Sequence, residues 1–443
     1  MKSKVLILYR NTNYPLRTTI KDHLYSFKKY APTKCYYLNT SLGKFPKYLS
    51  KINFDFIIFH TTFLSSRWSG DEKFRNHLEK ISLVKNFQAI KIALPQDDFI
   101  YTDSLCDFIN EFKIKYVFSA APRSELPKIY HNVDFSKVSF FEVLTGYLDD
   151  KTIKKINAMA KKIKRRKIDI GYRAYKAPQS LGKFGFLKTQ ISDIFCQEAP
   201  KYGLKIDIST DGKDTLLGDA WYKFLLTCKY CIGVEGGSSI LDRNGTIRAK
   251  TIDYLKLNPN ATFEKIEQTC FPELDGLLKL QVLTPRHLEA CATNTCQILL
   301  TGQYNGILKP RVHFIELARD FSNIEEVLRM VKNDQTREKL VTQAYKDIVE
   351  SKKYTYKNFV EFVLQKATIN QRPLKKYTLY EQFFYHWLNL KDKLNWLFII
   401  FVRLAIYRLL RTFYLWINSL KFVPTSFLNN MPLYKRIIHL SKQ

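Results

Sequence analysis

Short apolar runs alternate with amphipathic stretches along the first 150 residues of the chain. The runs occupy residues 5–9, 54–60, 89–94 and 116–118, with helical patterns between them at 72–84 and 104–112. Strands that alternate with helices predict a parallel sheet covered on both faces. Ligands bind such sheets beyond the carboxyl ends of the strands. This rule directs attention to His60 after the second run and to Asp97 and Asp98 after the third.

A second block of strands and helices follows a basic stretch at residues 161–167, which is typical of a solvated helix end or linker. Its strands are expected near residues 205–208, 230–234 and 297–300, and its helices near 188–198, 285–292 and 324–331. The predicted fold class is therefore α/β, with two Rossmann-like domains. We place them at residues 1–165 and 166–352, followed by a linking helix at 353–374 and a helical tail at 375–443.

The tail differs in composition from the rest of the chain. Residues 396–417 are about as long as a membrane span, but they include Arg403, Arg408 and Arg411. Each Arg near the centre of a span costs about 2.5–3.5 kcal/mol, which argues against a crossing. Residues 366–443 hold 13 Lys or Arg and 2 Asp or Glu, a net charge of +11. A basic amphipathic helix with many aromatics predicts a segment in the headgroup plane of an anionic membrane, and packing on the protein itself or at a homodimer interface is the alternative.

The overall charge points to an anionic partner. The 443 residues include 71 Lys or Arg and 41 Asp or Glu, a net of +30. Nucleic acid, an anionic membrane and a phosphorylated substrate all fit such an excess. We expect no nucleic acid, because the charge is spread along the chain and no helix-turn-helix, zinc-finger or RNA-binding sheet motif is evident.

The eight cysteines indicate neither a disulfide framework nor a metal site. They occur singly or in short pairs, and the apolar run at residues 5–9 suits a strand better than a signal peptide, so we expect reduced thiols in the cytoplasm. Cys228 and Cys231 lack a second Cys or His pair at a metal-site spacing. We therefore predict no essential metal, and no cofactor.

One segment of the second block has the pattern of a phosphate site. A predicted strand reaches Gly171, Arg173 follows it, and glycines at 182 and 185 precede Lys188 at the start of a helix. Backbone N–H groups at a helix start favour an anion, and Arg and Lys add direct charge. A purely structural glycine-rich turn remains the alternative.

Two further segments have polar groups at the ends of predicted strands. Glu235 is followed by Gly237, Ser238 and Ser239, where glycine lets the backbone approach a ligand closely. Further along, Arg286 and Glu289 share one face of a helix that begins at Pro285. The carboxylate could accept two ribose hydroxyls, or it could pair with Arg286 on the surface.

In order and spacing these segments resemble the donor-binding domain of GT-B glycosyltransferases, in the group-1-like branch with a Pro-Arg-x-x-Glu-Ala element. The resemblance covers roughly residues 168–332 and includes Leu-Pro-Gln-Asp-Asp at 94–98. Enzymes of this family assemble bacterial surface polysaccharides. The resemblance implies two Rossmann-like domains that face each other across a cleft, with the nucleotide bound to the C-terminal one.

The resemblance also implies roles for individual residues. Arg173 and Lys188 match the diphosphate-binding pair, and Glu289 matches the second Glu of a Glu-x7-Glu element, which binds the ribose. Gln281 stands at the first position of that element, where the family has a Glu that contacts the donor sugar. Asn294 also stands where the family usually has Gly. These departures leave the sugar and the stereochemistry open, and they keep a non-catalytic scaffold as an alternative.

The expected reaction moves a sugar from a nucleotide-sugar donor to a glycan or lipid-linked acceptor at the inner face of the cytoplasmic membrane. Arg173, Lys188 and the helix start would stabilise the departing nucleoside diphosphate without a metal. An inverting enzyme also needs a base on the acceptor side. Asp97, Asp98 and His60 all follow predicted strand ends of the N-terminal domain and are the candidates, with Asp97 favoured.

Overall fold

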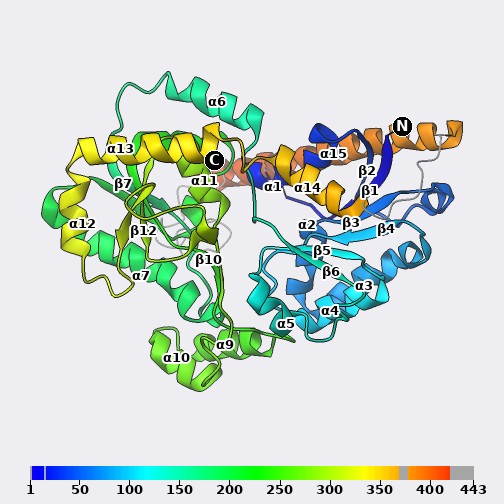
Figure 1. The fold of residues 1–443 in the computed structure, drawn as a ribbon, viewed down its shortest axis with the longest axis horizontal. Helices are drawn as coiled ribbons and strands as arrows, with labels where there is room; N and C mark the ends of the chain where they lie inside the picture. The colour runs from blue at the N-terminus through cyan, green and yellow to red at the C-terminus, as the bar shows by residue number, and fades with distance from the viewer. Residues whose placement is uncertain (1, 14–15, 369–377, 420–443) are drawn as a thin grey trace.

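The computed structural model describes residues 2–13, 16–368 and 378–419. The first domain is built on a six-stranded parallel sheet in the order β2-β1-β3-β4-β5-β6 (Figure 1). Its strands are β1 (Ser3–Tyr9), β2 (Thr33–Asn39), β3 (Phe56–Phe59), β4 (Ile90–Ala93), β5 (Tyr116–Ser119) and β6 (Ser139–Glu142). Its helices are α1 (Thr18–Tyr30), α2 (Thr61–Leu64), α3 (Asp71–Lys80), α4 (Thr102–Glu111) and α5 (Leu126–Ile129).

Both faces of this sheet are covered, because alternate side chains of the central strands enter two separate cores. Leu6 and Leu8 enter the core on one face, whereas Val5 and Ile7 enter the core on the other. This explains why the central strands consist of continuous apolar runs. The sequence did not predict β2 and β6, whose aromatic and polar residues interrupt such a run.

The second domain contains a five-stranded parallel sheet in the order β13-β12-β9-β7-β8. Its strands are β7 (Ile168–Arg173), β8 (Ile206–Ser209), β9 (Cys228–Gly233), β12 (Cys296–Leu300) and β13 (Phe314–Leu317). A short antiparallel pair, β10 (Gly236–Ser238) and β11 (Leu280–Val282), lies apart from it. The helices are α6 (Asp150–Ala160), which leads into the domain, then α7 (Gly182–Glu198), α8 (Asp219–Thr227), α9 (Thr246–Leu257), α10 (Phe263–Cys270), α11 (Pro285–Ala292), α12 (Ile324–Val331) and α13 (Asp334–Ala344).

The chain then returns to the first domain. Helix α14 (Tyr356–Thr368) supplies Phe359 and Val363 to the core that covers one face of the first sheet. The segment predicted as a linking helix is therefore part of the N-terminal domain. Its apolar face finds a partner there, which a single helical pattern cannot reveal.

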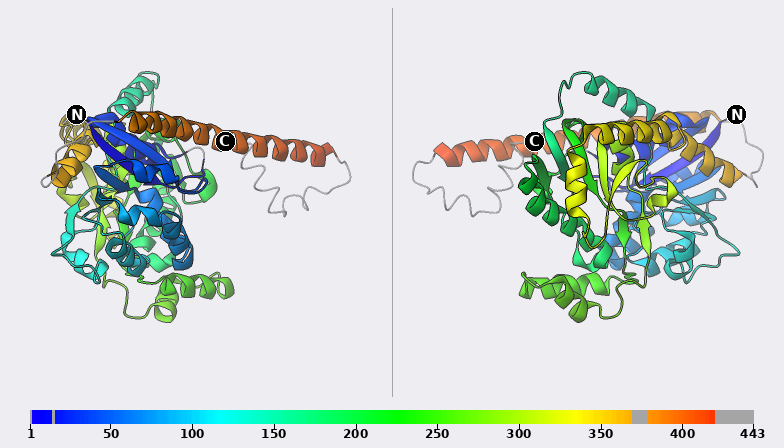
Figure 2. Two further views of the ribbon diagram at one scale, coloured as in Figure 1. Left: turned by 90° about the vertical axis from the view of Figure 1, so that its right-hand side faces the viewer. Right: turned by 60° about the vertical axis from the view of Figure 1, so that its left-hand side comes forward.

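Helix α15 (Leu379–Ser419) begins on the same domain, beside β2. The Lys4 ammonium and the Glu381 carboxylate form a buried ion pair of 2.7 Å. The Tyr9 hydroxyl donates a hydrogen bond of 2.5 Å to Asp392. The predicted tail is thus partly a packed element of the fold, and Figure 2 shows α15 extending from the body as one long helix.

The two Rossmann-like domains face each other, the GT-B arrangement that the sequence predicts (Figure 1). Within the described residues, no helix is both long enough and apolar enough to cross a bilayer. Residues 369–374 of the predicted linking helix and residues 375–377 and 420–443 of the predicted tail lie outside the described part of the chain.

Candidate functional site

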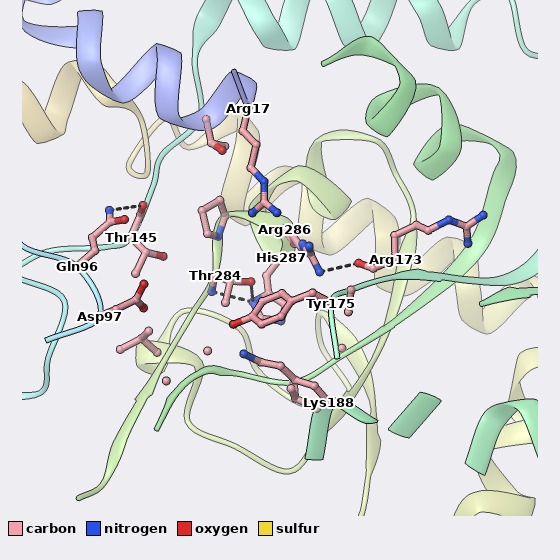
Figure 3. Close-up of a pocket in the computed structure, with 18 of the residues that line it drawn as sticks. Arg17, Gln96, Asp97, Thr145, Arg173, Tyr175, Lys188, Thr284, Arg286 and His287 are labelled. Carbon is pink, nitrogen blue, oxygen red and sulfur yellow. Dashed lines mark hydrogen bonds between the residues drawn. The ribbon is translucent and has the colours of Figure 1, made fainter. Parts of the chain in front are cut away.

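A cavity of about 670 Å³ lies between the two domains. It is bordered by segments that follow the carboxyl ends of β1, β3, β4 and β5 on one side and of β7 and β9 on the other. Ligand sites form at this edge of parallel sheets. Polar side chains from both domains line it: Arg17, His23, Gln96, Asp97, Arg173, Tyr175, Lys188, Trp221, Tyr222, Arg286, His287 and Glu289. Figure 3 labels Arg17, Gln96, Asp97, Arg173, Tyr175, Lys188, Arg286 and His287 among them.

Asp97 is the candidate base that the structure places at this cavity. Its carboxylate is exposed to the cavity, and its backbone is left-handed, with φ of 53°. The fully buried Arg67 donates hydrogen bonds to the carbonyls of Gln96 at 3.1 Å and Asp97 at 2.7 Å, which holds this turn. The protein around the cavity partly desolvates the Asp97 carboxylate and so raises its pKa above its ordinary value, and the Arg67 and Lys188 cations oppose that shift.

The other two candidate bases point elsewhere. Asp98 also borders the cavity, but its side chain is buried, and its carboxylate accepts hydrogen bonds from Ser119 at 2.5 Å and Tyr130 at 2.7 Å. His60 is buried, and its ring bonds Thr62 on one side and His23 on the other, at 2.8 Å. Both predictions of a catalytic role are corrected on this geometry, because the position after a strand end does not fix where a side chain points.

His23 lines the cavity where His60 was expected to do so. Burial lowers the pKa of His23 to about 4, and burial together with His23 lowers the pKa of His60. The two imidazoles are therefore neutral near pH 7. No motif marked His23, since it lies within the amphipathic pattern of α1.

Three cationic side chains line the cavity. Lys188, on α7, lies with its ammonium 5.6 Å from the centre of the Tyr175 ring. Arg286, on α11, donates a hydrogen bond of 2.6 Å to the Arg173 carbonyl. Arg17 reaches toward Arg286 from the N-terminal domain (Figure 3). Burial lowers the pKa of Lys188, and the Asp97 carboxylate opposes that shift. Burial also lowers the pKa of Arg17, and the Arg286 cation lowers it further.

Arg173 lines the same cavity, but its guanidinium is engaged by the protein. It forms an ion pair of 2.6 Å with Asp207 and lies 4.4 Å from the centre of the Phe224 ring. Figure 3 shows it directed away from Lys188. A Cβ at Gly171 would overlap Phe224 and Cys228, so this glycine is required by packing. The geometry therefore gives Arg173 and Gly171 structural roles, whereas Lys188, the third residue of the predicted phosphate site, lines the cavity together with Arg286.

The start of α7 is also occupied by the protein itself. The Lys183 amide donates to the Asp275 carboxylate at 2.8 Å, and the Phe184 amide donates to the Ser239 hydroxyl at 3.4 Å. These groups satisfy amides that an anion would otherwise use. The glycine-rich turn is thus structural, the alternative that its pattern allowed.

Glu289 lies at the cavity as the resemblance implies. Its carboxylate accepts hydrogen bonds from the Trp221 ring nitrogen at 2.7 Å and the Tyr222 hydroxyl at 3.4 Å. Burial raises its pKa to about 7, and the Trp221 hydrogen bond and Arg286 oppose the rise. The predicted surface pair with Arg286 is not the arrangement found, since Arg286 bonds the Arg173 carbonyl and lies 5.6 Å from the Trp221 ring centre.

Four of the predicted donor-binding residues have structural roles. Glu235 accepts a hydrogen bond of 2.7 Å from the Tyr304 amide, and Gln281 accepts one of 3.1 Å from Arg319. Ser238 and Ser239 donate to the Leu181 carbonyl. These four side chains are thus bonded within the protein, to main-chain groups or, for Gln281, to the Arg319 side chain.

Gly237 does line the cavity, beside Gly236. Its φ is 131°, and a Cβ there would overlap the carbonyl oxygen of Leu280 on the neighbouring strand. Glycine is therefore needed for the close approach of β10 and β11, and it brings this pair to the cavity wall.

Among the residues that the structure describes, no three His, Cys, Asp or Glu side chains form a group that could hold a metal ion.

No family model matches the chain, and no curated protein matches it. Solved structures show weak similarity. Anabaena Alr3699/HepE in complex with UDP and glucose aligns with TM-score 0.47 and 7% identity over 83% of this chain and 100% of that chain. The DNA-modifying β-glucosyltransferase aligns with TM-score 0.43 and 11% identity over 82% and 99%.

A glycosyltransferase from Rickettsia africae aligns with TM-score 0.40 and 8% identity over 83% of this chain and 98% of that chain. At such values these similarities carry no argument about residues or activity. The function of this chain is therefore inferred from the cavity and its side chains.

Proposed function

We propose that the protein is a glycosyltransferase that uses a nucleotide-sugar donor. The observation that supports this most is that the two domains place groups of different charge on the wall of one cavity. A carboxylate, Asp97, faces it from the N-terminal domain, whereas Lys188, Arg286 and Glu289 line it from the C-terminal domain. A base opposite a cationic site is what inverting transfer from a phosphorylated donor to a hydroxyl requires.

In the proposed reaction Asp97 accepts the proton of the acceptor hydroxyl. The hydroxyl oxygen bonds to the anomeric carbon as the bond from that carbon to the diphosphate oxygen breaks. Lys188 and Arg286 stabilise the charge that develops on the nucleoside diphosphate, in place of a metal ion. Glu289 accepts hydrogen bonds from the ribose hydroxyls. The raised pKa of Asp97 supports its role, because a more basic carboxylate takes a proton more readily.

We further propose surface-polysaccharide assembly as the setting, with a glycan or lipid-linked acceptor at the inner face of the cytoplasmic membrane. The Pro-Arg-x-x-Glu-Ala element at residues 285–290 supports membership of the group-1-like branch. The basic, aromatic residues 375–443 support attachment to an anionic membrane.

A non-catalytic subunit that binds a nucleotide sugar is the second candidate. The side chain of Gln281 favours it, since it replaces a sugar-contacting Glu and is bonded to Arg319. Turnover separates the two candidates, because both bind the donor and only the enzyme transfers the sugar.

Donor binding is tested first, by measuring thermal stabilisation with a panel of nucleotide sugars, since a ligand that binds only the folded state raises its stability. The best ligand is then titrated by calorimetry against Lys188→Met and against Lys183→Met, an exposed lysine on the same helix. We expect affinity to fall about tenfold or more for Lys188→Met alone, as for loss of one charged hydrogen bond. Equal affinities for both variants and the unchanged protein would contradict the proposed donor site.

A further inference from the structure

Helix α15 carries apolar residues on two opposite faces. One face packs on the N-terminal domain, where Leu388 is 1% exposed and Ile399 is 7% exposed. Polar contacts hold this face in place, since Glu381 pairs with Lys4 and Asp392 accepts hydrogen bonds from Tyr9 and Tyr25. The packing of the inner face fixes which side of the helix is turned away from the protein.

The side turned away forms a continuous apolar stripe, which we call the outer face. At about 100° per residue its members fall within a sector of about 100°, opposite Leu388 and Asp392, and span about 30 Å of helix. Their side chains are between 46% and 69% exposed: Phe383, Trp387, Leu390, Leu394, Leu397, Phe401 and Leu404. So large an apolar stripe marks an interaction surface.

Between residues 379 and 393 the charges of α15 are sorted between the two faces. Both carboxylates of the helix, Glu381 and Asp392, are buried against the N-terminal domain. Lys391 and Lys393 border the outer face on its two sides, as their positions on the helix require. Long basic side chains at the border of an apolar face can lie along it and hold their charge at a lipid headgroup.

We propose that the outer face of α15 is a membrane-binding surface that inserts among the headgroups of an anionic bilayer. This rests on the proposed membrane location and assigns it to described residues of the folded body. The N-terminal domain, rather than a separate tail, would then be held at the bilayer by a helix packed against its own sheet.

A second copy of the chain fits this surface less well. The outer face has the three-and-four spacing of a coiled-coil seam, but Lys391 and Lys393 at its borders have no carboxylate to pair with across such a seam, because Glu381 and Asp392 are buried on the opposite face. From Phe398 onward the apolar surface also widens, since Phe398, Ile406 and Leu409 are 58%, 50% and 71% exposed. A bilayer accommodates that width, whereas a narrow helical seam does not.

The test is co-sedimentation of the full chain with vesicles of phosphatidylglycerol and phosphatidylcholine in equal parts. The variant Leu397→Gln, Phe401→Gln, Leu404→Gln removes part of the outer face. Its matched control, Leu257→Gln, Leu277→Gln, Val312→Gln, changes exposed apolar residues on the C-terminal domain. We expect the outer-face variant to lose at least about tenfold in partition coefficient and the control to match the unchanged protein.

A second variant tests the charges. Lys391→Gln with Lys393→Gln should weaken binding to the mixed vesicles, with little effect on vesicles of phosphatidylcholine alone. Unchanged vesicle binding by the outer-face variant would overturn the proposal. A second result would also overturn it. In that case the unchanged protein does not bind vesicles but forms a dimer, measured by sedimentation equilibrium, and the outer-face variant is a monomer while the control variant stays a dimer.

These measurements are independent of the reaction, because vesicle binding is measured without donor. Donor binding and transfer to a water-soluble acceptor, measured without vesicles, should be unchanged in the outer-face variant. Failure of transfer by the unchanged protein would contradict the proposed function and leave the membrane surface standing.

Discussion

The guanidinium of Arg67 donates a hydrogen bond to the main-chain carbonyl of Asp97, the residue whose carboxylate faces the cavity from the N-terminal domain. Arg67 is fully buried and also bonds the carbonyls of Leu64, Gln96 and Ile100. A single buried side chain therefore organises the backbone that presents the candidate base.

Replacing Arg67 by Gln should cost several kcal/mol of unfolding free energy, since each buried carbonyl left without a donor costs about 1–3 kcal/mol. Turnover should fall as well, because the turn at Asp97 loses its support. The control is Arg75→Gln, which breaks only exposed ion pairs on α3, with an expected cost below about 1 kcal/mol. Urea unfolding monitors stability, and similar losses in the two variants would contradict this account.

Asp97→Asn should lower kcat by about 10²–10⁴-fold, the usual contribution of a general base, and leave donor affinity nearly unchanged. Asn tolerates the left-handed backbone found at this position, so the fold should be retained. Single-turnover kinetics and calorimetry measure the two quantities separately. Wild-type turnover in this variant would exclude Asp97 as the base.

Glu289 should make stability depend on pH. Its pKa in the folded protein is raised from 4.5 to about 7, so the folded state keeps a proton that the unfolded chain releases. This contribution is fully present below about pH 4.5 and is lost as the pH rises to about 7, by up to about 3 kcal/mol. Glu289→Gln should remove that part of the pH dependence, as measured by urea unfolding at pH 5 and pH 8. Glu325→Gln, at an exposed position on α12, is the control.

Gly237→Ala should destabilise the C-terminal domain by at least about 1–3 kcal/mol, because the backbone is strained for any other residue and the Cβ meets the Leu280 carbonyl. Gly212→Ala meets no atom within 4 Å and should change stability by less than about 1 kcal/mol. Thermal unfolding of the two variants distinguishes a close strand approach from a general intolerance of alanine.

The sequence was most informative where a pattern reflects the backbone. Apolar runs predicted the central strands, and the alternation of strands and helices predicted two parallel sheets. It was less informative where a polar side chain can either face a ligand site or form a hydrogen bond inside the protein. Asp97 and Asp98 are neighbours after the same strand, yet one faces the cavity and the other bonds Tyr130, because successive side chains point in different directions.

Tertiary partners account for the remaining differences. Arg173 follows a strand as expected, but Asp207 on the neighbouring strand binds its guanidinium, and only the sheet order places these two residues together. Arg17 belongs to no motif, so the sequence did not mark it. It lies in the connection between β1 and α1, and the rule that ligands bind beyond the carboxyl ends of parallel strands would have included it.

The return of α14 and α15 to the first sheet has a consequence for the order in which the protein folds during synthesis. Strands β1 to β6 are complete by Glu142, but Phe359 and Val363 cover one face of their sheet and Asp392 bonds Tyr9 at its end. The ribosome makes the whole second domain before it delivers these residues. The domain that begins first is therefore completed last, and its apolar face must be kept from other chains until then.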